Sequence, residues 1–147
     1  MEQMEQPGEA CLSLCRGKFL ELLKEGRWEY VRRVNASGAV MIVAVTKEGE
    51  LLLVEEYRVP LHARTVGLPA GISGDEGEES TLQSARRELE AETGYRADSW
   101  TYLFAGPSSP GLTTEMVSFY LAEDLHRISA GGGVSHENIP VHRIPLP

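Results

Sequence analysis

The stretch Gly71–Tyr95, GISGDEGEESTLQSARRELEAETGY, decides the fold of this 147-residue chain. Ser80 and Gln83 fit the S-x-x-Q pattern of a helix capping box, in which side chains satisfy the free N–H groups of the first turn. Gly94 is the residue type that commonly ends a helix, because it adopts the left-handed conformation without strain. The pattern therefore predicts a helix over residues 81–93, preceded by a glycine-rich loop.

Two glutamates, Glu88 and Glu92, lie one turn apart on this predicted helix. Carboxylates at positions i and i+4 share one face, and their repulsion costs about 0.2–0.5 kcal/mol. A cation between them would remove that repulsion, and hard oxygen ligands favour Mg²⁺ or Mn²⁺. Arg87, beside them, can orient carboxylates through charge-assisted hydrogen bonds. The alternative is that this acidic face is ordinary solvated surface.

The length and the 41 % hydrophobic content suit a single domain with one core. We expect a loose N-terminal arm at 1–15 and one domain at 16–147, divided into a hairpin at 16–37 and a catalytic core at 38–147. No apolar run approaches the ~18 residues of a membrane span, and the acidic start MEQMEQPGEA is not a signal peptide. The expected location is cytoplasmic, with no membrane partner.

The charges and cysteines narrow the function further. The net charge of −8 argues against a nucleic-acid partner, since nucleic-acid binding relies on basic patches. Anionic small substrates stay possible, because bound divalent cations reverse the local charge. Cys11 and Cys15 make neither a disulfide framework nor a four-ligand zinc site, so we expect two reduced thiols.

Strand patterns outnumber helix patterns along the chain. A hairpin is predicted from FLELL and RWEYVRRV, joined at Glu25–Gly26, and the run AVMIVAVT has the continuous apolar character of a buried central strand. The predicted strands after the hairpin are 39–46, 51–57, 65–70, 99–104, 116–121 and 139–144. This mixed order indicates an α+β or α/β/α fold rather than an alternating parallel sheet.

The segment 71–95 resembles the Nudix box, G-x5-E-x7-R-E-U-x-E-E-x-G-U, where U is apolar. The matching residues are Gly71, Glu79, Arg87, Glu88, Leu89, Glu92, Gly94 and Tyr95. Two extra residues lie before Glu79, and Ala91 stands where the first glutamate of the E-E pair belongs. The resemblance implies a Nudix-type α/β/α sandwich with a mixed sheet and an N-terminal β-hairpin, and hydrolysis that depends on Mg²⁺ or Mn²⁺.

The same resemblance assigns roles within the box. Glu88 and Glu92 are the implied metal ligands, and Arg87 belongs with them to the catalytic group. Ala91 leaves the number of metal ions open, and it is compatible with retained but reduced activity.

Two segments near the box narrow the resemblance to ADP-ribose pyrophosphatases. The stretch 54–60, VEEYRVP, looks like their V-x-Q-Y/F-R-x-P strand end, and LPAG at 68–71 is similar to the segment that leads into their box. Pro110, 15 residues beyond Tyr95, is a further mark of that group. The resemblance implies that the Ala70 carbonyl is a metal ligand and that Arg58 holds phosphate or ribose oxygens.

The two ends of the chain carry the remaining implied residues. The hairpin resembles one that grips adenine in some relatives, often across a homodimer: Trp28 would stack on the base, Glu29 would accept from its amino group, and Arg33 would hold phosphate or ribose. Glu137 resembles the late acidic residue that supplies a further metal ligand or the catalytic base. His136 is the alternative base.

The function that the resemblance implies is hydrolysis of the pyrophosphate bond of a nucleoside diphosphate sugar, with ADP-ribose giving AMP and ribose 5-phosphate. A UDP- or GDP-sugar is an alternative substrate. Ala91 also keeps open a module that binds ADP-ribose without cleaving it. The sequence ends at Pro147 without the C-terminal helix that such enzymes usually carry, which leaves the third layer of the sandwich open.

Overall fold

The computed structural model describes residues 10–134 and 137–147, so His136 lies outside the described residues. Within those ranges the chain forms one α-helix, one short 3-10 helix and ten strands. The helices are α1 (Thr81–Thr93) and η1 (Val59–Leu61). The strands are β1 (Leu12–Arg16), β2 (Leu20–Glu25), β3 (Trp28–Arg33), β4 (Gly38–Ala44), β5 (Glu50–Arg58), β6 (Ala63–Gly67), β7 (Ala70–Ser73), β8 (Tyr95–Pro107), β9 (Met116–Arg127) and β10 (Val141–Pro145).

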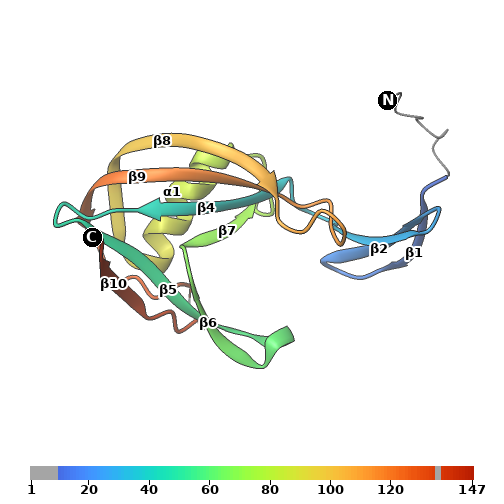
Figure 1. Ribbon diagram of the computed structural model, residues 1–147, viewed down its shortest axis with the longest axis horizontal. Coiled ribbons are helices and arrows are strands. Elements are labelled where there is room, and N and C mark those ends of the chain that lie inside the picture. The colour runs from blue at the N-terminus through green and yellow to red at the C-terminus, as the bar shows by residue number, and fades with distance from the viewer. Residues whose placement is uncertain (1–9, 135–136) are drawn as a thin grey trace.

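The strands form three sheets. A four-stranded sheet has the order β7-β4-β9-β8, and two three-stranded sheets have the orders β10-β5-β6 and β1-β2-β3. Strands β4 and β9 are parallel while the other pairs are antiparallel, so the central sheet is mixed. Figure 1 shows α1 beside the central sheet and the β1-β2-β3 sheet extending from one end of the molecule. The predicted α+β class, mixed sheet and N-terminal antiparallel strands are confirmed.

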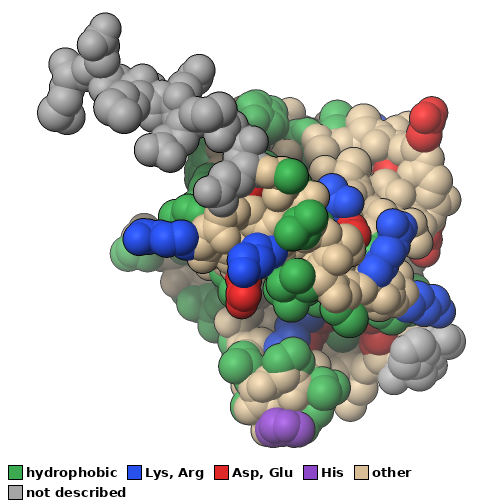
Figure 2. All heavy atoms as spheres, turned by 90° about the vertical axis from the view of Figure 1, so that its right-hand side faces the viewer, with side chains coloured by type: hydrophobic (Ala, Val, Ile, Leu, Met, Phe, Trp, Pro, Cys, Tyr) green, Lys and Arg blue, Asp and Glu red, His purple; other side chains and the backbone are tan. Residues whose placement is uncertain are grey.

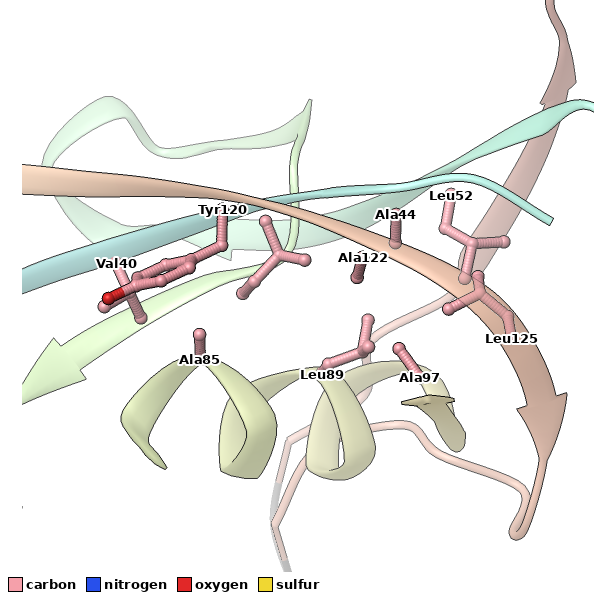
Figure 3. Packing of buried hydrophobic residues seen from close by; sticks show 10 residues of the cluster. Val40, Ala44, Leu52, Ala85, Leu89, Ala97, Tyr120, Ala122 and Leu125 are labelled. Atoms are coloured by element: carbon pink, nitrogen blue, oxygen red, sulfur yellow. The ribbon is translucent and has the colours of Figure 1, made fainter. Parts of the chain in front are cut away.

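The core lies between α1 and the central sheet. Side chains alternate along β4, and Val40, Ile42 and Ala44 are fully buried on one face. Helix α1 contributes Ala85 and Leu89, which lie opposite these strands in Figure 3. Burying one such large aliphatic side chain stabilises the fold by about 1.5–3 kcal/mol. This packing fixes the position of α1 on the central sheet and its rotation about its own axis. It therefore also fixes the direction in which the acidic face of the helix points.

Helix α1 begins and ends where the sequence predicts. The capping box is formed by two hydrogen bonds, from Gln83 N to Ser80 Oγ at 3.2 Å and from Ser80 N to Gln83 Oε1 at 2.8 Å. Gly94 ends the helix with φ of 76°, in the left-handed region. With 13 residues, α1 is too short to cross a membrane, and the described part of the chain contains no other α-helix.

Three features differ from the prediction. Strand β1 (Leu12–Arg16) pairs with β2, although residues 12–15 were predicted to belong to a loose arm. The predicted strand 65–70 is divided between β6 and β7, because Pro69 has no N–H for a sheet ladder. The described residues form no second helical layer. On the sheet face opposite α1, Phe104 instead stacks on Phe119 with ring centroids 4.6 Å apart.

Candidate active site

Ala70 presents its backbone polar groups to the box helix. In an antiparallel pair of strands, hydrogen-bonded and non-hydrogen-bonded residue pairs alternate. Ile42 N donates to Pro69 O at 2.9 Å, so the next pair, Met41 and Ala70, is not hydrogen-bonded. The N–H and C=O groups of Ala70 therefore point away from β4. Strand β7 is the edge of its sheet, and the Ala70 N–H donates to Glu92 Oε2 at 3.1 Å. The Ala70 carbonyl therefore faces the same free edge as Glu92.

Gly71 makes room for Glu88. A Cβ atom at position 71 would lie 2.1 Å from Glu88 Cδ and 2.3 Å from its Oε1. Any side chain larger than hydrogen would therefore push the carboxylate away from β7. This close approach gives a physical reason for the glycine that opens the box motif.

Arg87 ties the loop before α1 to the helix. Its guanidinium donates to Glu88 Oε1 at 2.7 Å, to Glu79 Oε1 at 2.8 Å and to the Ile72 carbonyl at 3.2 Å. The Glu79 hydrogen bond is the main reason that the pKa of Arg87 is raised, and it also lowers the pKa of Glu79. We regard Arg87 as a positioning residue, because its contacts hold the loop and the Glu88 carboxylate in place.

Burial makes ionisation of the Glu92 and Glu88 carboxyl groups unfavourable. Glu92 is only 5 % exposed, and burial raises its pKa to about 8, with further increases from Glu56, Glu88 and Glu137. The Ala70 N–H opposes that shift. Burial also raises the pKa of Glu88, although Arg87 partly compensates. The negative charge of the ionised carboxylates therefore exceeds the positive charge that Arg87 supplies beside them.

A glycine loop brings Glu137 to these carboxylates. Gly132 N and Gly133 N each donate, at 2.9 Å, to a carbonyl in the last turn of α1. After this docking the chain turns back, and Val134 N donates to Glu137 Oε2 at 2.8 Å. The negative charge of Glu137 makes a small contribution to the raised pKa values of Glu88 and Glu92.

Two predicted substrate-binding cations lie near the box. Arg58 Nη2 pairs with Glu56 Oε2 at 2.5 Å, next to the carboxylate cluster. Arg33 pairs with Glu115 and lines a cavity of about 300 Å³ together with Ile72 and Asp75. Arg33 is therefore close to the segment that precedes α1, whereas Arg58 is tied to Glu56 on β5.

Trp28 and Glu29 lie on the N-terminal sheet, which extends away from the central sheet in Figure 1. The Trp28 side chain lies next to Gly111 and is 62 % exposed. Hydrogen bonds join β3 to the loop at 112–114, with Val31 N donating to Leu112 O at 2.8 Å. Within the described ranges, no hydrogen bond or ion pair joins Trp28 or Glu29 to Glu88, Glu92 or Glu137.

Two acids that were not predicted add to the negative charge at the box: Asp75 raises the pKa of Glu88, and Glu56 raises that of Glu92. Glu56 occupies the glutamine position of the V-x-Q-Y/F-R-x-P pattern. It follows Leu52 and Val54 on the inner face of β5, and this alternation is the sequence signal that points to it.

The residue types fit a divalent cation. Carboxylate and carbonyl oxygens are the ligands that Mg²⁺ and Mn²⁺ prefer, and Gly71 leaves the space in which the Glu88 carboxylate lies. Each carboxylate currently has its own hydrogen-bond partner, and no three acidic, His or Cys side chains in the described ranges are grouped as a metal site. Glu88, Glu92, Glu137 and the Ala70 carbonyl are the groups available to hold the ion.

Comparison with known proteins agrees with this geometry. The NUDIX domain family matches residues 36–143. The protein named ADP-ribose pyrophosphatase in Bacillus subtilis (strain 168) is 37 % identical over 131 residues, which cover 85 % of this chain and 70 % of that protein. The GDP-mannose pyrophosphatase of Escherichia coli (strain K12) is 31 % identical over 134 residues, covering 86 % and 67 %.

A solved structure titled "Crystal structure of ADP compounds hydrolase" superposes with a TM-score of 0.75 at 27 % identity, covering 95 % of this chain and 77 % of that one. The family match covers most of the chain and includes the whole acidic box. The chain therefore belongs to the NUDIX domain family and is a Nudix hydrolase.

Proposed function

We propose that this protein hydrolyses the pyrophosphate bond of a nucleoside diphosphate sugar with the help of Mg²⁺ or Mn²⁺, and that ADP-ribose is its substrate, giving AMP and ribose 5-phosphate. The observation that carries the proposal is the convergence of Glu88, Glu92 and the Ala70 edge of β7 on one side of α1. The B. subtilis relative, named for this activity, supports the choice of substrate.

The chemistry requires groups of this kind. A pyrophosphate carries dense negative charge and repels an anionic nucleophile. A divalent cation held by Glu88, Glu92 and the Ala70 carbonyl would neutralise that charge and lower the pKa of a bound water. Glu137 would accept the proton of the attacking water, with its carboxylate held by the Val134 N–H.

Arg58 and Arg33 suit the remaining anionic part of the substrate. Their guanidiniums can bind phosphate or ribose oxygens in bidentate fashion. Arg33 lines the cavity beside Ile72 and Asp75, so a phosphate bound there would lie next to the loop that leads into α1. Substrate binding in this cavity would require Arg33 to share or leave its ion pair with Glu115.

We also propose a homodimer in which the N-terminal sheet completes the site of the partner. The sheet exposes apolar side chains that a monomer would leave in water: Leu12, Leu14, Phe19, Leu20 and Trp28. Figure 2 views this end of the molecule and shows apolar and basic side chains side by side. In such a dimer Trp28 would stack on adenine and Glu29 would accept from its amino group.

A GDP-sugar is the second candidate substrate, because the E. coli relative is named a GDP-mannose pyrophosphatase. A substrate panel tests the choice: ADP-ribose, GDP-mannose and a UDP-sugar are incubated with Mg²⁺, and release of AMP, GMP or UMP is measured. The proposal predicts the highest kcat/KM for ADP-ribose. A higher value for GDP-mannose would replace the substrate, and calorimetric binding of ADP-ribose without AMP release would indicate a non-catalytic binding module.

A further inference from the structure

Arg64 on β6 reaches across β5 to the segment that leads into β10. Strand β5 lies between β6 and β10, and Arg64 is the register partner of Tyr57 on β5. Glu55 lies two residues before Tyr57, so its side chain is on the same face and within diagonal reach of Arg64. Arg64 Nε donates to Glu55 Oε1 at 2.6 Å, and Nη2 donates to the carbonyl oxygens of Glu55 and Asn138, both at 3.1 Å.

Glu55 holds Arg64 and the start of β10 at the same time. Its second carboxylate oxygen, Oε2, pairs with His142 Nε2 at 2.9 Å, and its backbone N–H donates to the Pro140 carbonyl at 3.0 Å. The chain is therefore attached to β5 from Pro140 onward. The bond from Arg64 extends this attachment back to Asn138, the residue that follows Glu137.

The Glu137 carboxylate lies beside the glycine loop that docks on α1. Its Oε2 accepts from Val134 N at 2.8 Å, and a Cβ atom at position 133 would lie 2.3 Å from the same oxygen. Gly133 N donates to the Ala91 carbonyl in the last turn of α1 at 2.9 Å. The position of Glu137 therefore depends on two attachments, one to α1 before it and one to the β10-β5-β6 sheet after it.

We propose that Arg64 is a positioning residue for Glu137. It fixes the Asn138 carbonyl to the sheet that also carries Arg58, and so keeps the Glu137 carboxylate beside the last turn of α1. A group that accepts a proton from the attacking water needs such support, because a displacement of about 1 Å costs about 10²-fold in rate. This inference rests on the role proposed above for Glu137.

Arg64→Gln tests the inference, because the shorter amide cannot reach Glu55 and Asn138 together. Arg143→Gln is the matched control. Arg143 also pairs with an acid of β5, with its Nε donating to Glu50 Oε2 at 2.7 Å, and it is 48 % exposed against 38 % for Arg64. Its partner lies at the opposite end of β5 from the Glu137 segment.

Amide hydrogen exchange, followed by NMR on the full chain, shows without catalysis how firmly the Glu137 segment is held. Glu137 N donates to Val134 O at 2.7 Å and Ile139 N donates to Gly132 O at 3.2 Å, so both amides report on it. We expect exchange at both to become about 10-fold faster in Arg64→Gln, since one hydrogen bond that holds the segment is lost. Arg143→Gln should leave both rates unchanged. Unchanged rates in Arg64→Gln would overturn the inference, as would equal acceleration by Arg143→Gln.

Hydrolysis of ADP-ribose shows whether the effect of Arg64 passes through Glu137. We expect Arg64→Gln to lower kcat about 10-fold with KM within about twofold of the parent, because the substrate contacts stay in place. Added to Glu137→Gln, the same change should lower kcat no further, since residues that act as one unit are not additive. Losses of kcat that multiply in the double variant would contradict the inference. If the parent releases no AMP, the proposed function fails, and the exchange rates still decide whether Arg64 holds the Glu137 segment.

Discussion

The carboxylate cluster and the N-terminal sheet are held in place in opposite ways. Glu88 and Glu92 lie against β7, where a backbone N–H, a guanidinium and the absent side chain of Gly71 fix their positions. Every residue of β1 is exposed, and Trp28 on β3 is 62 % exposed. The first region therefore holds its predicted ligands in fixed positions, whereas the second carries its predicted binding groups on an open surface.

This contrast separates two kinds of contribution to function. Groups that carry out chemistry need rigid support, because a displacement of about 1 Å costs about 10²-fold in rate. Groups that grip a base by stacking tolerate a looser position. Variants in the first region should therefore lower kcat strongly, and variants in the second should mainly raise KM.

The largest effect is expected from Glu92→Gln. Loss of this proposed ligand should lower Mg²⁺-dependent kcat/KM for ADP-ribose at least about 10³-fold, since a bound cation contributes several kcal/mol to the transition state. Steady-state AMP release measures the effect, with Glu90→Gln as the control that keeps activity. Undiminished turnover in Glu92→Gln would refute the site.

Gly71→Ala should have the next largest effect. The new methyl group would lie 2.1 Å from Glu88 Cδ, so the carboxylate has to move. We expect a fall of about 10²-fold in kcat with a smaller change in KM for ADP-ribose. Gly67→Ala is the control, because a Cβ there meets nothing within 4 Å. Equal activity of the two variants would contradict the role assigned to Gly71.

The metal-free protein should lose stability as the pH rises. Glu92 has a folded-state pKa of about 8 against an ordinary value of 4.5, so the folded state binds more protons than the unfolded state between these values. The free energy of unfolding should therefore fall from about pH 4.5 to pH 8, by about 3 to 5 kcal/mol from this group. Urea unfolding in EDTA measures the slope. Saturating Mg²⁺ should reduce it, and Glu92→Gln should make it shallower by the contribution of this group, whereas an equal slope in that variant would refute the assignment.

Trp28→Ala should have the smallest effect of the four. Stacking on a base is worth about 1–3 kcal/mol, so KM for ADP-ribose should rise about 5- to 150-fold with little change in kcat. Mixing refolded Trp28→Ala and Glu92→Gln chains tests the dimer. If Trp28 serves the partner's site, each mixed dimer contains one complete site and the KM of the parent for ADP-ribose returns in part of the mixture. A mixture that keeps only the raised KM of Trp28→Ala would place Trp28 in the site of its own chain.

Local sequence rules predicted the box well. The capping residues Ser80 and Gln83, the terminating Gly94 and the shared face of Glu88 and Glu92 follow from helix geometry alone, and the structure has the helix at the predicted residues. The site around it depends on contacts between distant segments. The hydrogen bond from the Ala70 N–H to Glu92 requires β7 to lie beside α1, which no spacing within either segment reveals.

The misplaced boundaries have a similar origin. Strand β1 forms because its backbone pairs with β2. The sequence of residues 12–16 has no clear alternation of apolar and polar side chains that would predict a strand. Pro69 divides a stretch that reads as one strand, since the chain changes sheets there. The described residues contain no second helical layer, and no residue of the box determines whether such a layer forms, so the match of that segment did not predict it.

Titration of Mn²⁺ into the parent and into the double variant Glu88→Gln/Glu92→Gln tests the central claim most directly, because it asks whether these two carboxylates hold the cation. The account predicts saturable binding by the parent and by Glu90→Gln, and loss of that binding in the double variant. A double variant that stays folded and binds Mn²⁺ with the Kd of the parent would contradict it.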